Sequence, residues 1–125
     1  MTDNMLSGHR ILIVEDNALL AMSFEDIISR SGAEVVGPAG TLAEAEMLAM
    51  GETLSGAMLD IKLHYEEVWP VARILAGRGI PFVFCSGHFE PHSLPPEWAQ
   101  RPILVKPARP RHIIEKLLQA VGLKV

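Results

Sequence analysis

The sequence is poor in several features that define common protein classes, and each shortage narrows the range of functions. Its 125 residues include a single cysteine, Cys85, so an internal disulfide is excluded and a cysteine-based zinc site is not indicated. No apolar run approaches the roughly 20 residues that cross a bilayer, and the first ten residues lack the apolar core of a secretory signal. The 11 Lys and Arg are outnumbered by 15 Asp and Glu, which leaves no positive field for nucleic acid phosphates. We therefore expect one intracellular domain that binds neither nucleic acid nor membrane.

Short apolar runs alternate with segments of helical periodicity along the chain. The run Ile11–Val14 is wholly apolar and rich in β-branched residues, which is typical of a strand covered on both faces. Asn17 is a candidate helix N-cap, and Thr41–Glu44 has the form of a capping box. The expected strands are 11–14, 33–36, 56–60, 82–85 and 103–105, and the expected helices are 17–32, 41–51, one from 70 and one from 110. This alternation predicts a parallel sheet with helices on both faces.

The segment 87–102 interrupts the alternation. It contains four prolines, which leave no room for a full-length helix. At most a single turn is expected around residues 93–100. The helix between the fourth and fifth strands is therefore expected to be shortened or irregular.

Polar side chains follow the apolar runs at the points where the strands end. Glu15 and Asp16 follow the first run, Asp60 ends the third, Ser86 follows the fourth and Lys106 follows the fifth. Parallel strands end at the same edge of a sheet, where ligands bind, so we expect these side chains to lie together. One carboxylate alone is explained as a cap or turn residue. Three crowded carboxylates repel and raise each other's pKa unless a cation offsets the charge.

Magnesium suits such a site because it binds one or two carboxylates, keeps several waters and leaves room for phosphate oxygens. A cation site beside a lysine and a hydroxyl provides the groups that phosphoryl transfer uses. The residues themselves therefore point to phosphoryl chemistry at this edge.

Four segments resemble the receiver domain of two-component response regulators, and they are Ile11–Asp16, Met58–Asp60, Cys85–Gly87 and Leu104–Pro107. They follow in the order and spacing of that family, and the resemblance covers essentially the whole chain. Phe84–Gly87 is similar to the Phe-Ala-Thr-Gly fourth strand of a stand-alone subgroup. The resemblance implies one flavodoxin-like receiver domain over residues 1–125, with a doubly wound five-stranded parallel sheet of order 2-1-3-4-5. A flexible N-terminal extension is expected over residues 1–9.

The resemblance also implies roles for the residues at the strand ends. Asp60 would be the phosphoacceptor, which takes a phosphoryl group from a phosphohistidine, and Lys106 would pair with it. Glu15 and Asp16 would hold Mg²⁺ (or Mn²⁺) together with Asp60 and the backbone carbonyl of Lys62.

The resemblance also singles out positions that would take part in the conformational switch on phosphorylation, and positions that would set the lifetime of the phosphoryl group. Ser86 would hydrogen-bond a phosphoryl oxygen and move inward on phosphorylation. Ile103 stands where the family's switch has Tyr or Phe, so no aromatic rotamer swing is expected there. Lys62 and His88 stand where the family tunes attack by water, and their alternative interpretation is that they are solvated loop side chains.

Three classes of function compete. The first is a phosphorylatable receiver in the bacterial cytoplasm. Its phosphodonor would be a sensor histidine kinase or a histidine phosphotransfer domain, and its output a contact with an unidentified downstream protein. It would catalyse its own phosphorylation and slow dephosphorylation without turning over an external substrate. The second is a pseudo-receiver that binds proteins independently of phosphorylation. The third, a dehalogenase-type hydrolase, requires a second Asp two residues after Asp60, where Lys62 stands.

Overall fold

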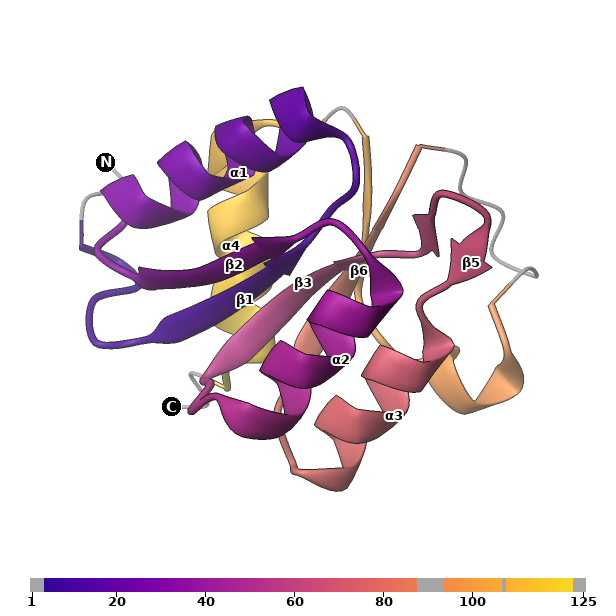
Figure 1. Ribbon diagram of the computed structural model, residues 1–125. Coiled ribbons are helices and arrows are strands. Elements are labelled where there is room, and N and C mark those ends of the chain that lie inside the picture. Colours follow the sequence, from indigo (N-terminus) through magenta and orange to yellow (C-terminus); the bar gives the residue numbers. More distant parts are fainter. Residues whose placement is uncertain (1–3, 88–93, 107, 123–125) are drawn as a thin grey trace.

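The predicted strands assemble into one parallel sheet of order β2-β1-β3-β6-β7, which is the expected order 2-1-3-4-5 (Figure 1). Its members are β1 (Arg10–Val14), β2 (Glu34–Ala39), β3 (Gly56–Asp60), β6 (Phe82–Ser86) and β7 (Ile103–Val105). The structure is a computed structural model that describes residues 4–87, 94–106 and 108–122. Every residue of β3 is buried, as expected for the central strand of a sheet covered on both faces.

Helices cover the two faces of the sheet in pairs (Figure 1). α1 (Ala18–Arg30) and α4 (Pro110–Ala120) lie on one face, and α2 (Leu42–Gly51) and α3 (Trp69–Gly77) lie on the other. Successive strand residues point to opposite faces, so each strand feeds two separate cores. Leu59 belongs to the core under α2 and α3, whereas its neighbour Met58 belongs to the core under α1 and α4.

No helix in the described parts of the chain is long and apolar enough to cross a membrane.

Two of the predicted helix starts, at Asn17 and Thr41, are confirmed by their capping contacts. The side chain of Asn17 accepts a hydrogen bond from the backbone N of Leu20 at 3.0 Å. The Thr41 hydroxyl accepts from the backbone N of Glu44 at 3.2 Å, and the Glu44 carboxylate accepts in turn from the backbone N of Gly40. Both helices α1 and α2 therefore begin directly after the carboxyl end of a strand.

The predicted end of the second strand at Val36 is wrong, because β2 continues through Gly37 and Pro38 to Ala39. The pairing register between β1 and β2 shifts here, and Val14 pairs with Ala39. Gly37 has a φ of +92°, and a Cβ at this position would lie 2.8 Å from the backbone N of Ala39. Glycine thus permits the register shift by which β2 extends to the carboxyl edge of the sheet.

The connection after β3, and the described part of the one after β6, lack a full-length crossover helix next to the strand end. After β3 the chain forms a hairpin, β4 (Lys62–Leu63) with β5 (Glu66–Glu67), which the sequence analysis did not predict. After β6, the described residues contain only a 3₁₀ turn, η2 (Pro96–Trp98), so the expectation of a shortened helix is confirmed for this part. Residues 88–93 lie outside the described residues.

The turn η2 is held by an aromatic cluster. Trp98 is buried, and its ring lies edge-on to Phe82 and Phe84 at centroid distances of 5.7 and 6.4 Å. The guanidinium of Arg101 lies 4.3 Å from the centroid of the Phe82 ring. These contacts cover the part of the core that a full-length helix between β6 and β7 would cover if strands and helices alternated regularly.

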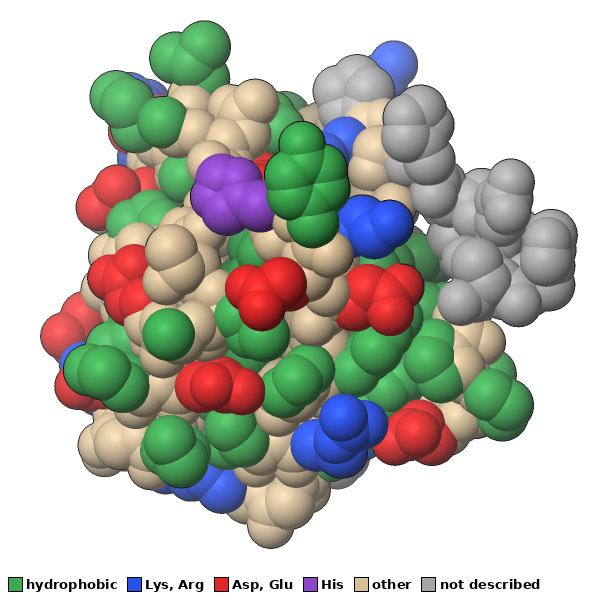
Figure 2. All heavy atoms as spheres, turned by 45° about the vertical axis from the view of Figure 1, so that its right-hand side comes forward, with side chains coloured by type: hydrophobic (Ala, Val, Ile, Leu, Met, Phe, Trp, Pro, Cys, Tyr) green, Lys and Arg blue, Asp and Glu red, His purple; other side chains and the backbone are tan. Residues whose placement is uncertain are grey.

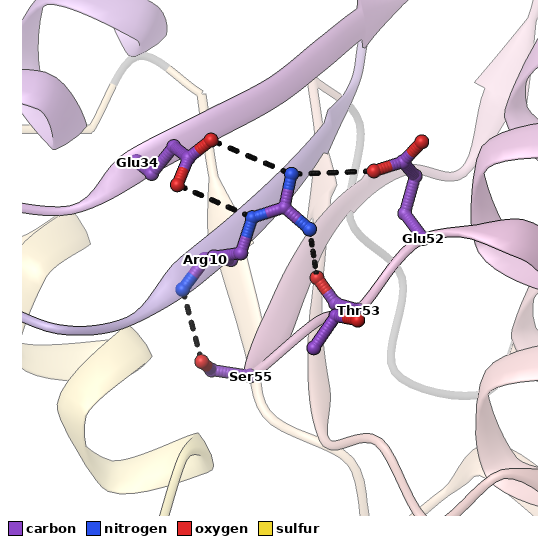
Figure 3. A network of polar contacts seen from close by, with 5 residues as sticks. All are labelled: Arg10, Glu34, Glu52, Thr53 and Ser55. Atoms are coloured by element: carbon purple, nitrogen blue, oxygen red, sulfur yellow. Dashed lines mark hydrogen bonds and ion pairs between the residues drawn. The ribbon is translucent and has the colours of Figure 1, made fainter.

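Arg10 joins three segments at the amino end of the sheet, away from the carboxyl edge (Figure 3). Its guanidinium forms ion pairs with Glu34 at 3.3 Å and Glu52 at 3.2 Å and donates to the carbonyl of Thr53 at 2.6 Å. Its backbone N donates to the Ser55 hydroxyl at 2.9 Å. The two carboxylates raise the pKa of Arg10, so this link between β1, β2 and the segment before β3 stays charged.

Exposed hydrophobic side chains lie scattered among acidic and basic ones on the face that Figure 2 shows. Met47 and Met50 on α2 are examples of exposed apolar side chains. Scattered exposure of this kind is ordinary for a protein surface.

Residues 4–9, which belong to the expected N-terminal extension, pack against the domain. Leu6 is fully buried in the core under α1 and α4, and its backbone N donates to the carbonyl of Ser31 at 2.8 Å. This segment therefore adds to the core.

Replacement of Leu6 by Ala should lower the free energy of unfolding by about 2–4 kcal/mol, because it leaves a cavity in the core. Denaturant unfolding measures the change. Met5→Ala is the matched control, since Met5 is 42% exposed and its loss should have little effect. Equal effects of the two substitutions would contradict the packing of this segment.

Candidate functional site

Three carboxylates meet at the carboxyl edge of the sheet. Glu15 and Asp16 follow β1, and Asp60 is the last residue of the neighbouring strand β3. One oxygen from each of the three lies within 4.8 Å of the others. Glu15 and Asp60 are buried, whereas Asp16 is partly exposed. The predicted acidic cluster is therefore present as a single site.

Lys106 lies between the two buried carboxylates. Its Nζ is 2.9 Å from Glu15 Oε1 and 3.3 Å from Asp60 Oδ1. The lysine follows β7, and its backbone N donates to the carbonyl of Ser86 at 2.8 Å, so the ends of β6 and β7 are joined next to the cluster. The side chain of Lys106 is only 15% exposed, so its charge acts in a partly desolvated environment.

The ionisation of Asp60 is strongly perturbed. Burial, followed by repulsion from Glu15, raises the pKa of Asp60 to about 7, and the charge of Lys106 opposes this only in part. Burial alone would lower the pKa of Lys106, but the hydrogen bond to Glu15 and the charge of Asp60 outweigh it, so the pKa is raised. The single ammonium charge of Lys106 therefore does not neutralise the negative charge of the three carboxylates.

Two further oxygens of the cluster, one of Glu15 and one of Asp16, accept hydrogen bonds from backbone N–H groups. Glu15 Oε2 accepts from the backbone N of Asn17 at 3.1 Å. Asp16 Oδ2 accepts from the backbone N of His64 at 2.6 Å, and the Nδ1 atom of His64 lies 3.5 Å from the same oxygen. These donors fix the orientation of the carboxylates without adding a compensating full charge.

The other predicted residues that the structure describes lie on β4, β6 and β7. Ser86 ends β6 and is partly exposed. The Lys62 side chain is exposed at the start of β4, and Ile103 is a partly buried residue of β7 that packs against the core under α2 and α3. Cys85 is buried, and burial raises the pKa of its thiol to about 12, so it is a protonated core residue. His88 lies outside the described residues.

Sequence reasoning missed His64 as a neighbour of the cluster. His64 and Tyr65 form the two-residue loop of the β4–β5 hairpin, and His64 has a φ of +56°. Short hairpins are usually signalled by Asn-Gly or a similar pair, and this loop has none. The one usable signal is the apolar Leu63 within a polar stretch, since this residue anchors the hairpin in the core.

The donor set fits a hard divalent cation. All three side chains offer carboxylate oxygens, which Mg²⁺ prefers, and the nearby Lys106 leaves the site with excess negative charge. A bound cation of this kind offsets the repulsion that raises the pKa of Asp60.

Solved structures with the same fold include receiver proteins. The chain is 37% identical to SdrG from Sphingomonas melonis Fr1, over 90% of this chain and 95% of that chain, with a TM-score of 0.79. It is 27% identical to a response regulator receiver domain protein (CheY-like) from Methanospirillum hungatei JF-1, over 90% and 93% of the two chains, with a TM-score of 0.80.

A third structure shares the fold at 20% identity. It is the receiver domain of the sensor histidine kinase PA1611 from Pseudomonas aeruginosa PAO1, which has a magnesium ion coordinated in its active site cleft. The match covers 93% of this chain and 99% of that chain, with a TM-score of 0.76. No protein-family model and no curated protein matches the chain.

The sheet order, the carboxylate cluster with its lysine, and these likenesses define the class of the protein. The chain belongs to the response regulator receiver family.

Replacement of Asp60 by Asn should stabilise the metal-free protein above neutral pH. The pKa of Asp60 is about 7 in the folded chain and 3.8 ordinarily, so the folded state binds a proton between these values. The stability that this group contributes is complete below about pH 4 and is lost as the pH rises through about 7. The gain from the substitution should therefore be on the order of 2 kcal/mol at pH 8, with allowance for solvent screening, and should vanish near pH 4.

Thermal unfolding in a chelator at several pH values measures this gain. Asp26→Asn is the control, because Asp26 is 60% exposed and lies on α1. A gain from Asp60→Asn that does not depend on pH would contradict the raised pKa.

Proposed function

We propose that this chain is a phosphoacceptor receiver, in which Asp60 accepts a phosphoryl group from a phosphohistidine. The observation that carries the proposal is the position of Asp60, at the end of β3 with Lys106 Nζ at 3.3 Å and two further carboxylates beside it. This arrangement combines a nucleophile, a fixed positive charge and a cation site at one strand end. The family membership supports the same function.

Glu15, Asp16 and Asp60, with the backbone carbonyl of Lys62, would hold the cation. Magnesium, when bound there, supplies positive charge that favours the ionised form of Asp60 and binds phosphoryl oxygens. Manganese has similar ligand preferences and would serve at the same residues.

Asp60 acts as the nucleophile. One of its carboxylate oxygens forms a bond to phosphorus, the bond from phosphorus to the donor imidazole nitrogen breaks, and the electron pair of that bond stays on the imidazole. The raised pKa of Asp60 keeps part of the population protonated and unreactive at neutral pH without a cation. Lys106 already lies between Glu15 and Asp60, so its charge is in place to stabilise the transferred phosphoryl oxygens without a large rearrangement.

Further residues that the receiver resemblance singles out would control the switch and the lifetime of the phosphoryl group. The Ser86 hydroxyl, at the end of β6, would donate a hydrogen bond to a phosphoryl oxygen and carry the change inward. Because Ile103 is aliphatic, the change would pass without an aromatic swing. Lys62 and His88 would set the rate at which water removes the phosphoryl group.

The partners follow from the chemistry. The phosphodonor would be a sensor histidine kinase or a histidine phosphotransfer domain in the cytoplasm of a bacterium, and phosphorylation would alter binding to a downstream protein. A coupling free energy of about 1–3 kcal/mol between phosphorylation and binding is enough to change the affinity for the downstream protein appreciably.

Incubation with acetyl phosphate and Mg²⁺ should add one phosphoryl group to the chain, as measured by intact-protein mass spectrometry. Asp60→Asn should abolish the adduct because it removes the nucleophile, and a chelator should abolish it because the cation is lost. Asp26→Asn, which alters an exposed carboxylate on α1, should leave the adduct unchanged.

A chain that forms no adduct with acetyl phosphate should be given a phosphorylated histidine phosphotransfer domain, since a protein donor supplies contacts that a small molecule lacks. Absence of transfer from both donors would contradict the proposal. It would favour a pseudo-receiver that binds proteins independently of phosphorylation.

A further inference from the structure

The β4–β5 hairpin connects the carboxylate cluster to the surface through one short hydrogen bond. The backbone N of His64 donates to Asp16 Oδ2 at 2.6 Å, across 48 positions of sequence. The hairpin lies on the side of the molecule where β5 is labelled in Figure 1, the side that Figure 2 brings forward. It directly follows the strand that carries Asp60.

The hairpin is anchored, so the position of its tip is defined. Leu63 is 1% exposed and belongs to the core under α2 and α3. At the base, the backbone N of Val68 donates to the carbonyl of Ile61 at 2.8 Å, and the backbone N of Ile61 donates to the carbonyl of Cys85 at 3.1 Å. The N–H group of His64 is thus presented to Asp16 from a fixed support.

His64 adopts a conformation that has a cost for its residue type. Its φ of +56° lies in the left-handed region, which few non-glycine residues adopt. This backbone conformation is the one in which the N–H of His64 meets the carboxylate of Asp16. The hydrogen bond to a charged acceptor offsets the backbone strain.

We propose that His64 is a positioning residue, whose backbone N–H holds the Asp16 carboxylate in the orientation that binds the cation. This inference rests on the proposed function, because it assumes that Asp16 is a metal ligand. Asp16 is the one member of the cluster with a partly exposed side chain, so it is the carboxylate that most needs an external constraint. Groups that hold a ligand in this way commonly contribute about 10–100-fold to metal affinity.

Two substitutions of His64 separate the backbone N–H from the imidazole. His64→Gly removes the imidazole, keeps the N–H and accepts a positive φ without strain. His64→Pro removes the N–H and fixes φ near −65°. Tyr65→Ala is the matched control in the same loop, because the Tyr65 side chain is 96% exposed and its loss should leave the packing of the hairpin unchanged.

Calorimetric titration with Mg²⁺ should give wild-type affinity for His64→Gly and Tyr65→Ala and about 10-fold weaker affinity for His64→Pro. Equal affinity in His64→Pro and the wild type would overturn the inference. Equal weakening in His64→Gly and His64→Pro would also overturn it, since the imidazole would then be the active group. A wild-type chain that binds no Mg²⁺ would instead overturn the proposed metal site itself.

A second measurement applies even where His64→Pro fails to fold. In ¹H–¹⁵N spectra of the wild type, the amide signal of His64 should lie far downfield, as for a short bond to a carboxylate, and should move when Mg²⁺ saturates the site. Asp16→Ala should shift this signal to an ordinary position. A signal of His64 that neither lies downfield nor responds to Mg²⁺ would overturn the inference.

Discussion

Three carboxylates crowded at the carboxyl edge of the sheet, two of them in contact with one lysine, are the constraint on which the rest of the structure depends. Glu15 and Asp60 are buried and both contact Lys106, and Asp16 completes the cluster from the rim. The arrangement is unfavourable without a cation, because burial and repulsion from Glu15 raise the pKa of Asp60 to about 7. Because of this repulsion, a positive charge bound at the cluster would change the ionisation of Asp60.

The packing of the fold offsets the unfavourable free energy of crowding and burying these carboxylates. Central strands that are buried on both faces place the carboxylates, and two separate cores fix the strand ends from above and below the sheet. At the opposite, amino end of the sheet, the ion pairs of Arg10 join β1 to β2 and to the segment before β3. The linkage between strands and the carboxylate cluster therefore lie at different ends of the sheet. The hairpin after Asp60 extends this support to the rim, where the backbone N of His64 donates a hydrogen bond to the partly exposed carboxylate of Asp16.

Much of this arrangement follows from local sequence patterns. Apolar runs of the right length predicted the strands, the Asn17 and Thr41 caps predicted the helix starts, and the rule that parallel strands share one carboxyl edge gathered Glu15, Asp60 and Lys106. Features that depend on tertiary contacts were not predictable. The continuation of β2 through Gly37 requires a register shift against β1, and the hairpin tip at His64 takes a positive φ without the usual turn residues. In both cases long-range pairing overrides local propensity.

The ionisation of Asp60 tests the central claim most directly. Titration of its side-chain carboxyl carbon by ¹³C NMR, in a chelator, should give a pKa near the value of about 7 that burial and Glu15 impose. The same titration with saturating Mg²⁺ should give a clearly lower pKa, because the cation favours the carboxylate. A carboxyl that titrates near 4 in both conditions would contradict the account, since such a group would feel neither the crowding nor the cation.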